Sequence, residues 1–315
     1  MKLFKSIFCF LKSQVYLLVA LLIGCLICRK FFYHGSDSSA VQALPLPKPV
    51  FDAVKNDNDQ LRQNVKDSLG NGQDLSIEAR VAVTKTLPDD LNKVELEKLL
   101  SSLLEARPSN LSDGAYAHYF HELCNKLHKF PDARTQFASV LYALASDPKR
   151  DDVIRDYSQQ HLRRIWEKSP ELAELRPAIE ASFWKLTEQQ PSVASSALLS
   201  LHTLGAPPSP HPDFSQSAVA SSVFQPRVES ILQQSPSSDA MALRMTAVRI
   251  AGERNLTALT PTLTQMIQNE SEHTLVRISA INALRLLGKS EEIKSLAIKL
   301  QQNVNLTTAF QYATR

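Results

Sequence analysis

Most of the chain after residue 75 repeats apolar side chains at intervals of three and four residues. The clearest stretch is 273–288, HTLVRISAINALRLLG, where large aliphatic residues recur at helical spacing with alanines among them. The apolar positions are Leu275, Ile278, Ile281, Leu284 and Leu287, and the alanines are Ala280 and Ala283. This period places the apolar positions on one face of an α-helix, and alanine lets a second helix come close. The pattern predicts a helix packed against a neighbour.

The same pattern returns elsewhere in the chain. The string MALRMTAVRIAG at 241–252 matches it at an offset of 33 residues, with Arg244 in the place of Arg277. Related strings occur at 193–205, at 153–166 and, more weakly, at 77–87. Segments that can supply a first helix to each unit are 170–189, 256–268 and 291–302. Repeated units of about 33–50 residues, each with two helices, are typical of an α-solenoid.

The string Val-Arg-x-x-Ala-x-x-Ala-Leu-x-x-Leu-Gly at 276–288 resembles the second helix of a HEAT repeat, one of the armadillo-like α-solenoid families. The resemblance implies stacked antiparallel helix pairs, and an irregular helical bundle is the alternative. In that family an acidic residue near the helix start often pairs with the following arginine along the stack. The residues that match are Asp152 with Arg155, Asp239 with Arg244, and Glu272 with Arg277.

Composition favours the same fold class. The chain holds only 8 glycines among 315 residues, whereas average proteins contain about 7% glycine. Sheets need turns, and many turns use glycine because it adopts positive φ without strain. Leu, Ala, Gln, Glu, Lys and Arg dominate from residue 75 onward, and these residues lose little freedom in a helix. We therefore expect an all-α protein.

The N-terminal segment differs from the rest. Residues 15–28, VYLLVALLIGCLIC, carry no charge, and Lys12 and Arg29 stand on either side. Extended back to Ile7, the segment forms a helix of about 33 Å, close to the roughly 30 Å hydrocarbon core of a bilayer, with Lys12 reaching the interface. We therefore expect a single transmembrane helix that acts as an uncleaved signal anchor.

This gives three parts: a signal anchor at 1–31, a flexible linker at 32–60 and a HEAT-like helical-repeat domain at 61–315. The linker prediction rests on the Ser- and Pro-rich run GSDSSAVQALPLPKP at 35–49. Three lysines and the α-amine precede the apolar segment, and two cations follow it. This charge bias favours a single-pass membrane protein with its C-terminal domain on the extracytoplasmic side.

A rival reading of the N-terminus stays open. Leu22-Ile23-Gly24-Cys25 resembles a bacterial lipobox, in which the signal peptide is removed and the cysteine, here Cys25, is lipidated. An ordinary cleaved signal peptide is a third possibility. All three place the rest of the chain at the membrane or beyond it.

Charge outside this segment argues against nucleic acid as a partner. The formal net charge of +3 includes five cations among the first 30 residues, which hold no acidic residue. Without them, 30 basic and 32 acidic residues remain. A nucleic-acid binder needs a basic surface to neutralise phosphates.

One group of side chains has the spacing of a metal site. His121, Cys124 and His128 stand three and four residues apart on a predicted helix at 115–130, on the side opposite its apolar residues. Such spacing places nitrogen and sulfur ligands on neighbouring turns, as zinc or copper requires. No phosphate-binding loop, zinc-protease motif, nucleophile elbow or Cys-x-x-Cys occurs, and no cofactor is indicated.

Two functions follow from these observations. The first is a membrane-anchored, non-catalytic helical-repeat scaffold that binds a protein or peptide partner. The alternative is a metal-dependent enzyme or metal-binding protein on the same frame, which uses the 118–128 cluster of histidines and cysteine. The long loop at 206–217 interrupts the repeat pattern, and its role stays open.

Overall fold

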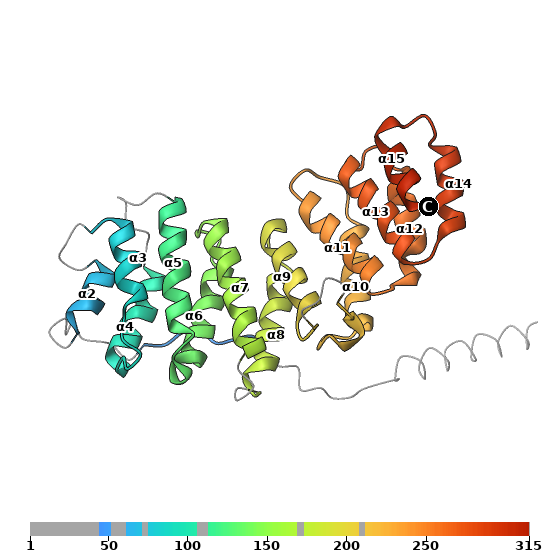
Figure 1. Ribbon diagram of the computed structural model, residues 1–315. Coiled ribbons are helices and arrows are strands. Elements are labelled where there is room, and N and C mark those ends of the chain that lie inside the picture. Colours follow the sequence, from blue (N-terminus) through green and yellow to red (C-terminus); the bar gives the residue numbers. More distant parts are fainter. Residues whose placement is uncertain are drawn as a thin grey trace, which may run out of the picture. The chain divides into compact units, whose positions relative to one another are not determined.

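The computed structural model describes residues 44–51, 61–70, 75–105, 113–168, 173–207 and 212–314. Within these ranges the protein is all-α, with fourteen α-helices, a few short 3-10 turns and no strand (Figure 1). The predicted anchor at 1–31 and the candidate lipidation site Cys25 lie outside the described residues. No helix in the described ranges is long and apolar enough to cross a membrane.

The helices follow one another with short connections. The first seven are α2 (Gln63–Leu69), α3 (Ile77–Lys85), α4 (Lys93–Leu104), α5 (Asp113–Leu127), α6 (Arg134–Ser146), α7 (Asp152–Lys168) and α8 (Leu175–Leu186). The others are α9 (Pro191–Thr203), α10 (Ser221–Leu232), α11 (Met241–Glu253), α12 (Thr260–Gln268), α13 (Thr274–Leu286), α14 (Ser290–Lys299) and α15 (Val304–Ala313).

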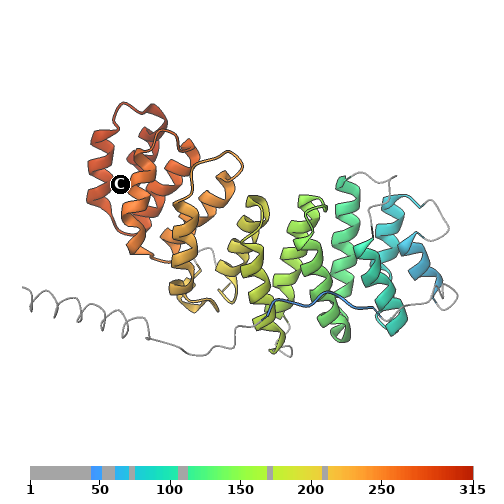
Figure 2. The same cartoon turned by 180° about the vertical axis from the view of Figure 1, so that it is seen from behind.

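The contacts between helices follow a regular order. Each odd-numbered helix from α3 to α15 packs against the next odd-numbered one. Among the even-numbered helices, α2, α4, α6 and α8 pack in the same way, as do α12 and α14, whereas α10 packs chiefly on α11. Neighbours in the chain such as α6 and α7, or α12 and α13, pack as pairs, so the odd- and even-numbered helices form two facing rows (Figures 1 and 2).

Local sequence explains where helices begin and end. Asn92 and Glu95 form a reciprocal capping box at the start of α4, and Ser76 accepts a hydrogen bond from the third backbone N–H of α3. Pro191 opens α9, where its missing N–H has no helical partner to lose. Gly288 follows α13 with φ of +70°, a conformation that other residues adopt only with strain.

The best repeat forms the predicted helix, and most of its predicted apolar face is buried. Ile281, Leu284 and Leu287 are buried as expected, whereas Leu275 is 47% exposed. Arg277 is buried as well, and its Nε donates to the carbonyl oxygen of Ile267 at 2.8 Å.

Buried arginines recur at one position of the fold. Arg155, Arg244 and Arg277 are each the fourth residue of a helix, in α7, α11 and α13. Each donates to the carbonyl oxygen of the penultimate residue of the preceding helix at 2.8–3.1 Å. The acceptors are Ala145, Ile231 and Ile267. A buried guanidinium thus satisfies carbonyls that the helix end leaves free.

In two of three cases, the acidic partner of the arginine is not the one that the HEAT-repeat resemblance implies. Arg155 meets Asp152 at 3.5 Å, as expected. Glu272 pairs with Arg244, which precedes it by 28 residues, and both side chains are buried. The expected pairings of Glu272 with Arg277 and of Asp239 with Arg244 are therefore not formed as such. The ion pair joins α11 to the turn before α13, so it links successive helix pairs.

An extended segment lies across the even-numbered helices. Residues 44–51, here called the strap, cross α8 and α6 in Figure 2. Leu46 is only 4% exposed and belongs to the hydrophobic core. The strap falls within the predicted linker at 32–60, whereas in the structure it packs with the helical unit, which begins at Leu44.

Candidate functional site

The three candidate metal ligands lie on or just after α5, but they do not meet. Cys124 is fully buried in the hydrophobic core beside Leu123 and Leu127, and burial raises the pKa of its thiol well above the usual value. The expectation that Cys124 shares a polar face with His121 and His128 is therefore wrong. The core covers more of α5 than one apolar stripe, because α3 and α7 both pack against this helix.

The two histidines are joined by a third one. His161 of α7 lies between them, with His128 Nε2 3.0 Å from its Nδ1 and His121 Nδ1 3.2 Å from its Nε2. Neighbouring ring centroids are 5.0–5.2 Å apart. We call His128, His161 and His121 the histidine chain. It connects α5 to α7 by side-chain hydrogen bonds.

The geometry of the histidine chain is that of a hydrogen-bond relay. A zinc ion needs one nitrogen from each ring directed at a single point about 2.0–2.1 Å away. Here His161 uses its two nitrogens for two different neighbours. Within the described ranges, no group of three or more His, Cys, Asp or Glu side chains is arranged to hold a metal ion.

Two rings of the histidine chain, His128 and His161, are held neutral. Burial lowers the pKa of His128 and of His161 to about 3, and the nearby positive groups, including Arg164, act in the same direction. In a neutral chain each hydrogen bond needs one N–H and one lone pair. A change of tautomer in His161 therefore requires both neighbouring rings to change with it.

His161 is not among the site residues that the sequence predicts. It stands 33 residues after His128, the offset that relates 241–252 to 273–288. A search for polar residues repeated at that offset would have paired the two. The spacing within one helix instead groups His121 and His128 with Cys124.

A second buried cluster surrounds His202 of α9. Its Nε2 lies 2.7 Å from Glu253 Oε2, and Arg254 Nε donates to its Nδ1 at 2.8 Å. Because Arg254 has no lone pair to offer, Nδ1 of His202 is the acceptor and Nε2 carries the proton that goes to Glu253. Arg254 also donates to the backbone oxygens of Val219 and His202.

The His202 cluster is closed to a substrate. The His202 ring is fully buried, both of its nitrogens are bonded, and Phe214 stacks on it with centroids 3.9 Å apart. Burial lowers its pKa, and the guanidinium of Arg254 acts in the same direction, while Glu253 opposes both. A general base needs a free lone pair within reach of a substrate proton, which this imidazole does not have.

Part of the loop at 206–217 belongs to this cluster. Phe214 opens the short 3-10 turn Phe214–Gln216, and Asp213 caps that turn by accepting from the backbone N–H of Ser215. Ala218 N–H donates to the Leu204 carbonyl at 2.9 Å, which closes the loop. The described end of the loop thus covers His202.

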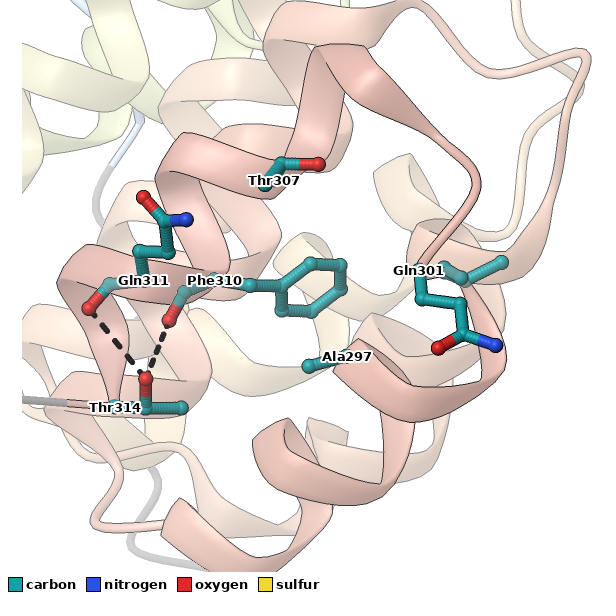
Figure 3. Close-up of a pocket in the computed structure, with 7 residues that line it drawn as sticks. Ala297, Gln301, Thr307, Phe310, Gln311 and Thr314 are labelled. Atoms are coloured by element: carbon teal, nitrogen blue, oxygen red, sulfur yellow. Dashed lines mark hydrogen bonds between the residues drawn. The ribbon is translucent and has the colours of Figure 1, made fainter.

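A small hollow lies between α14 and α15 (Figure 3). Its volume is about 210 Å³, below the roughly 300 Å³ at which ligand pockets begin. The lining consists of Ala297, Leu300, Gln301, Thr307, Phe310, Gln311 and Thr314. Thr314 directs its hydroxyl to the carbonyls of Phe310 and Gln311, as Figure 3 shows. No ionisable side chain lines the hollow, so it offers no acid, base or nucleophile.

Comparisons with known proteins were made at the levels of sequence family, curated sequence and solved structure. No family model, no curated protein and no solved structure matches the chain.

Proposed function

We propose that the protein is a membrane-anchored scaffold that binds a protein or peptide partner without catalysis. In this proposal residues 61–315 form a HEAT-like α-solenoid, and residues 1–31 hold it at the membrane with the helices on the extracytoplasmic side. The two facing rows of helices and the fixed register of the buried arginines support the solenoid. The uncharged run at 15–28 supports the anchor.

The arginine register is the observation that carries the proposal. Three helix pairs repeat the same bond, from the fourth residue of the second helix to the penultimate carbonyl of the first. Arg80 stands at the same position of α3 and is also buried. A stack of equivalent units buries its core between neighbours and leaves a long repeated surface for a partner.

That repeated surface carries exposed aliphatic side chains. Val153 and Leu275 are each the second residue of a helix, two positions before a buried arginine, and are 48% and 47% exposed. The two side chains hold equivalent positions on α7 and α13, so one elongated partner with apolar side chains fits both.

The ionisable clusters support a role without catalysis. His161 and His202 each use both ring nitrogens in internal hydrogen bonds, and both side chains are buried. Side chains bonded in this way join helices. The described residues thus favour binding over the metal-dependent alternative.

Photo-crosslinking in native membranes tests the proposal. A photoreactive residue is placed at Val153 or Leu275 in the full-length protein, with Glu291, a highly exposed side chain of α14, as the control position. We expect the same partner to be captured at both aliphatic positions and less of it at 291. A partner captured equally at all three positions, or at none, contradicts the proposal.

Membrane attachment is measured separately. The full-length protein is expected to stay with membranes under carbonate extraction. Recovery in the soluble fraction would refute the anchor. If a Cys25→Ser change alone releases the protein, the lipoprotein reading replaces the transmembrane one.

A further inference from the structure

The strap lies on the surface of the helices as a peptide ligand does, although it belongs to the same chain. It reads LPLPKPVF, and its three prolines fix φ near −65° and cannot donate backbone hydrogen bonds. Such a segment is stiff and extended without internal hydrogen bonds. Most of its side chains are exposed, Leu46 enters the core, and Phe51 is half-buried against it.

Two helices recognise its backbone. The N–H of Leu46 donates to Ser182 Oγ of α8 at 2.9 Å, and Gln136 Nε2 of α6 donates to the carbonyl of Val50 at 3.3 Å. The Ser182 hydroxyl in turn donates to the Ala178 carbonyl at 2.7 Å, which directs its lone pairs toward the strap. We call this surface of α6 and α8 the seat.

The pattern of contacts defines what the seat accepts. Leu46 is buried and Pro49 is half-buried, three residues apart, as expected for a left-handed extended helix with three residues per turn. Pro45 and Pro47 stay exposed, so they supply stiffness and no contact area. The seat thus contacts a buried leucine, a half-buried phenylalanine and two backbone groups of an extended segment.

We propose that the seat is a binding site for an extended, proline-spaced peptide segment with a central leucine, and that the strap is its resident occupant. A partner that carries such a segment binds by displacing the strap. The inference rests on the proposed scaffold function and names the class of partner. Extended proline-rich segments are common ligands because little conformational entropy is lost when they bind.

Competition with the strap determines the affinity. A segment joined to its site by a short chain acts at an effective concentration in the millimolar range. The wild-type protein therefore binds a free peptide weakly, since most seats are filled. A change that weakens the strap and leaves the seat intact raises the apparent affinity for the free peptide by the factor by which the fraction of empty seats rises.

Fluorescence anisotropy with a labelled peptide of residues 43–51, ALPLPKPVF, tests this on the full-length protein. We expect the Leu46→Ser protein to bind the peptide about tenfold more tightly than wild type, since it loses a buried leucine from the strap. Leu44→Ser is the matched control, because Leu44 is 81% exposed in the same segment, and should bind as wild type does. Adding Ser182→Ala to the Leu46→Ser protein should weaken binding.

The same pair of changes made in the peptide gives a second control. A peptide with the serine at position 46 should lose binding, and one with the serine at position 44 should keep it. Equal affinity of the two altered proteins, or of the two altered peptides, overturns the inference. So does tight binding that Ser182→Ala leaves unchanged.

Hydrogen exchange on the unaltered protein removes any dependence on the folding of variants. The Leu46 amide is bonded to Ser182 and should exchange slowly. Saturating peptide carrying the Leu44→Ser change, which differs in mass from the strap, should speed exchange at Leu46. Unchanged protection at saturation refutes displacement. If a partner is still captured at Val153 and Leu275, the scaffold proposal stands. Only the proposed peptide-binding role of the seat is then refuted.

Discussion

The histidine chain and the His202 cluster bury the same residue type in two different ways. Between α5 and α7, three imidazoles bond only to one another. Between α9 and α11, one imidazole lies between a carboxylate and a guanidinium, with Glu253 on one nitrogen and Arg254 on the other. Both clusters join neighbouring odd-numbered helices, and both satisfy ring nitrogens inside the fold.

The difference shows what each site tolerates. The histidine chain has no anion among its hydrogen-bond partners, so a proton added to it stays unbalanced in a region of low polarity. The His202 cluster contains a carboxylate, Glu253, and a guanidinium, Arg254. Removal of either group leaves the other charge without its counter-charge. We therefore expect the first cluster to respond to pH and the second to respond to loss of a single partner.

The largest effect is expected at Arg254. Its replacement by methionine keeps much of the volume but leaves His202 Nδ1 and the Val219 and His202 carbonyls without a donor. The free energy of unfolding should fall by about 3–5 kcal/mol, measured by urea denaturation followed by circular dichroism. Arg249→Met is the control, because Arg249 is exposed on the same turn and should cost less than about 1 kcal/mol. Equal losses would mean that the buried bonds of Arg254 contribute nothing.

A smaller loss is expected in the histidine chain. His161→Phe fills the space but removes both bonds and leaves His128 Nε2 and His121 Nδ1 unpaired. The unfolding free energy should fall by about 2–3 kcal/mol. His118→Phe on the exposed side of α5 should stay within about 0.5 kcal/mol of wild type. A loss at 118 as large as that at 161 would contradict the structural role of the chain.

Acid should weaken the histidine chain. His128 and His161 have pKa values of about 3 in the folded protein, against about 6.5 when unfolded. The unfolded chain therefore binds more protons below pH 6.5. The contribution of the pair is complete above that pH and is lost as the pH falls from 6.5 toward 3.

The slope of this loss approaches ~1.4 kcal/mol per pH unit for each histidine. Denaturation of wild type and of the His161→Phe protein between pH 7 and 4.5 measures it, because carboxylates contribute equally to both. We expect the variant to lose stability less steeply. Parallel slopes would show that the chain is protonated in the folded state.

The smallest effect is expected for Glu253→Gln. The amide oxygen can still accept from His202 Nε2, and only the charge is lost. The cost should be about 1 kcal/mol, because Glu253 is partly exposed and also bonds Arg249. A loss as large as that of Arg254→Met would show that the carboxylate charge is what holds the cluster.

The local pattern of the sequence was a good guide to helices and a poor one to side-chain pairing. The strings at 241–252 and 273–288 became α11 and α13 because period and small residues act within a single helix. Ala280 is fully buried, as its size predicts. Leu284 is buried as predicted, whereas Leu275 is exposed and Arg277 is buried.

Pairing failed for a different physical reason. Arg244 meets Glu272 across 28 residues, and His128 meets His161 across 33. Such contacts depend on how one helix is rotated against the next, which a single helical wheel does not contain. Cys124 was misplaced for the same reason, because its burial comes from the helices on both sides of α5.

The strap has a mechanical consequence. Residues 44–51 precede α2 in the chain, so under the proposed anchoring a pull from the membrane reaches the strap before any of the described helices. The load falls first on the buried side chain of Leu46 and on its bond to Ser182. Once unseated, the seventeen residues 44–60 can extend to at most about 60 Å before tension reaches α2. Under force, the contact between the strap and the seat therefore breaks first, while the stacked helices stay folded.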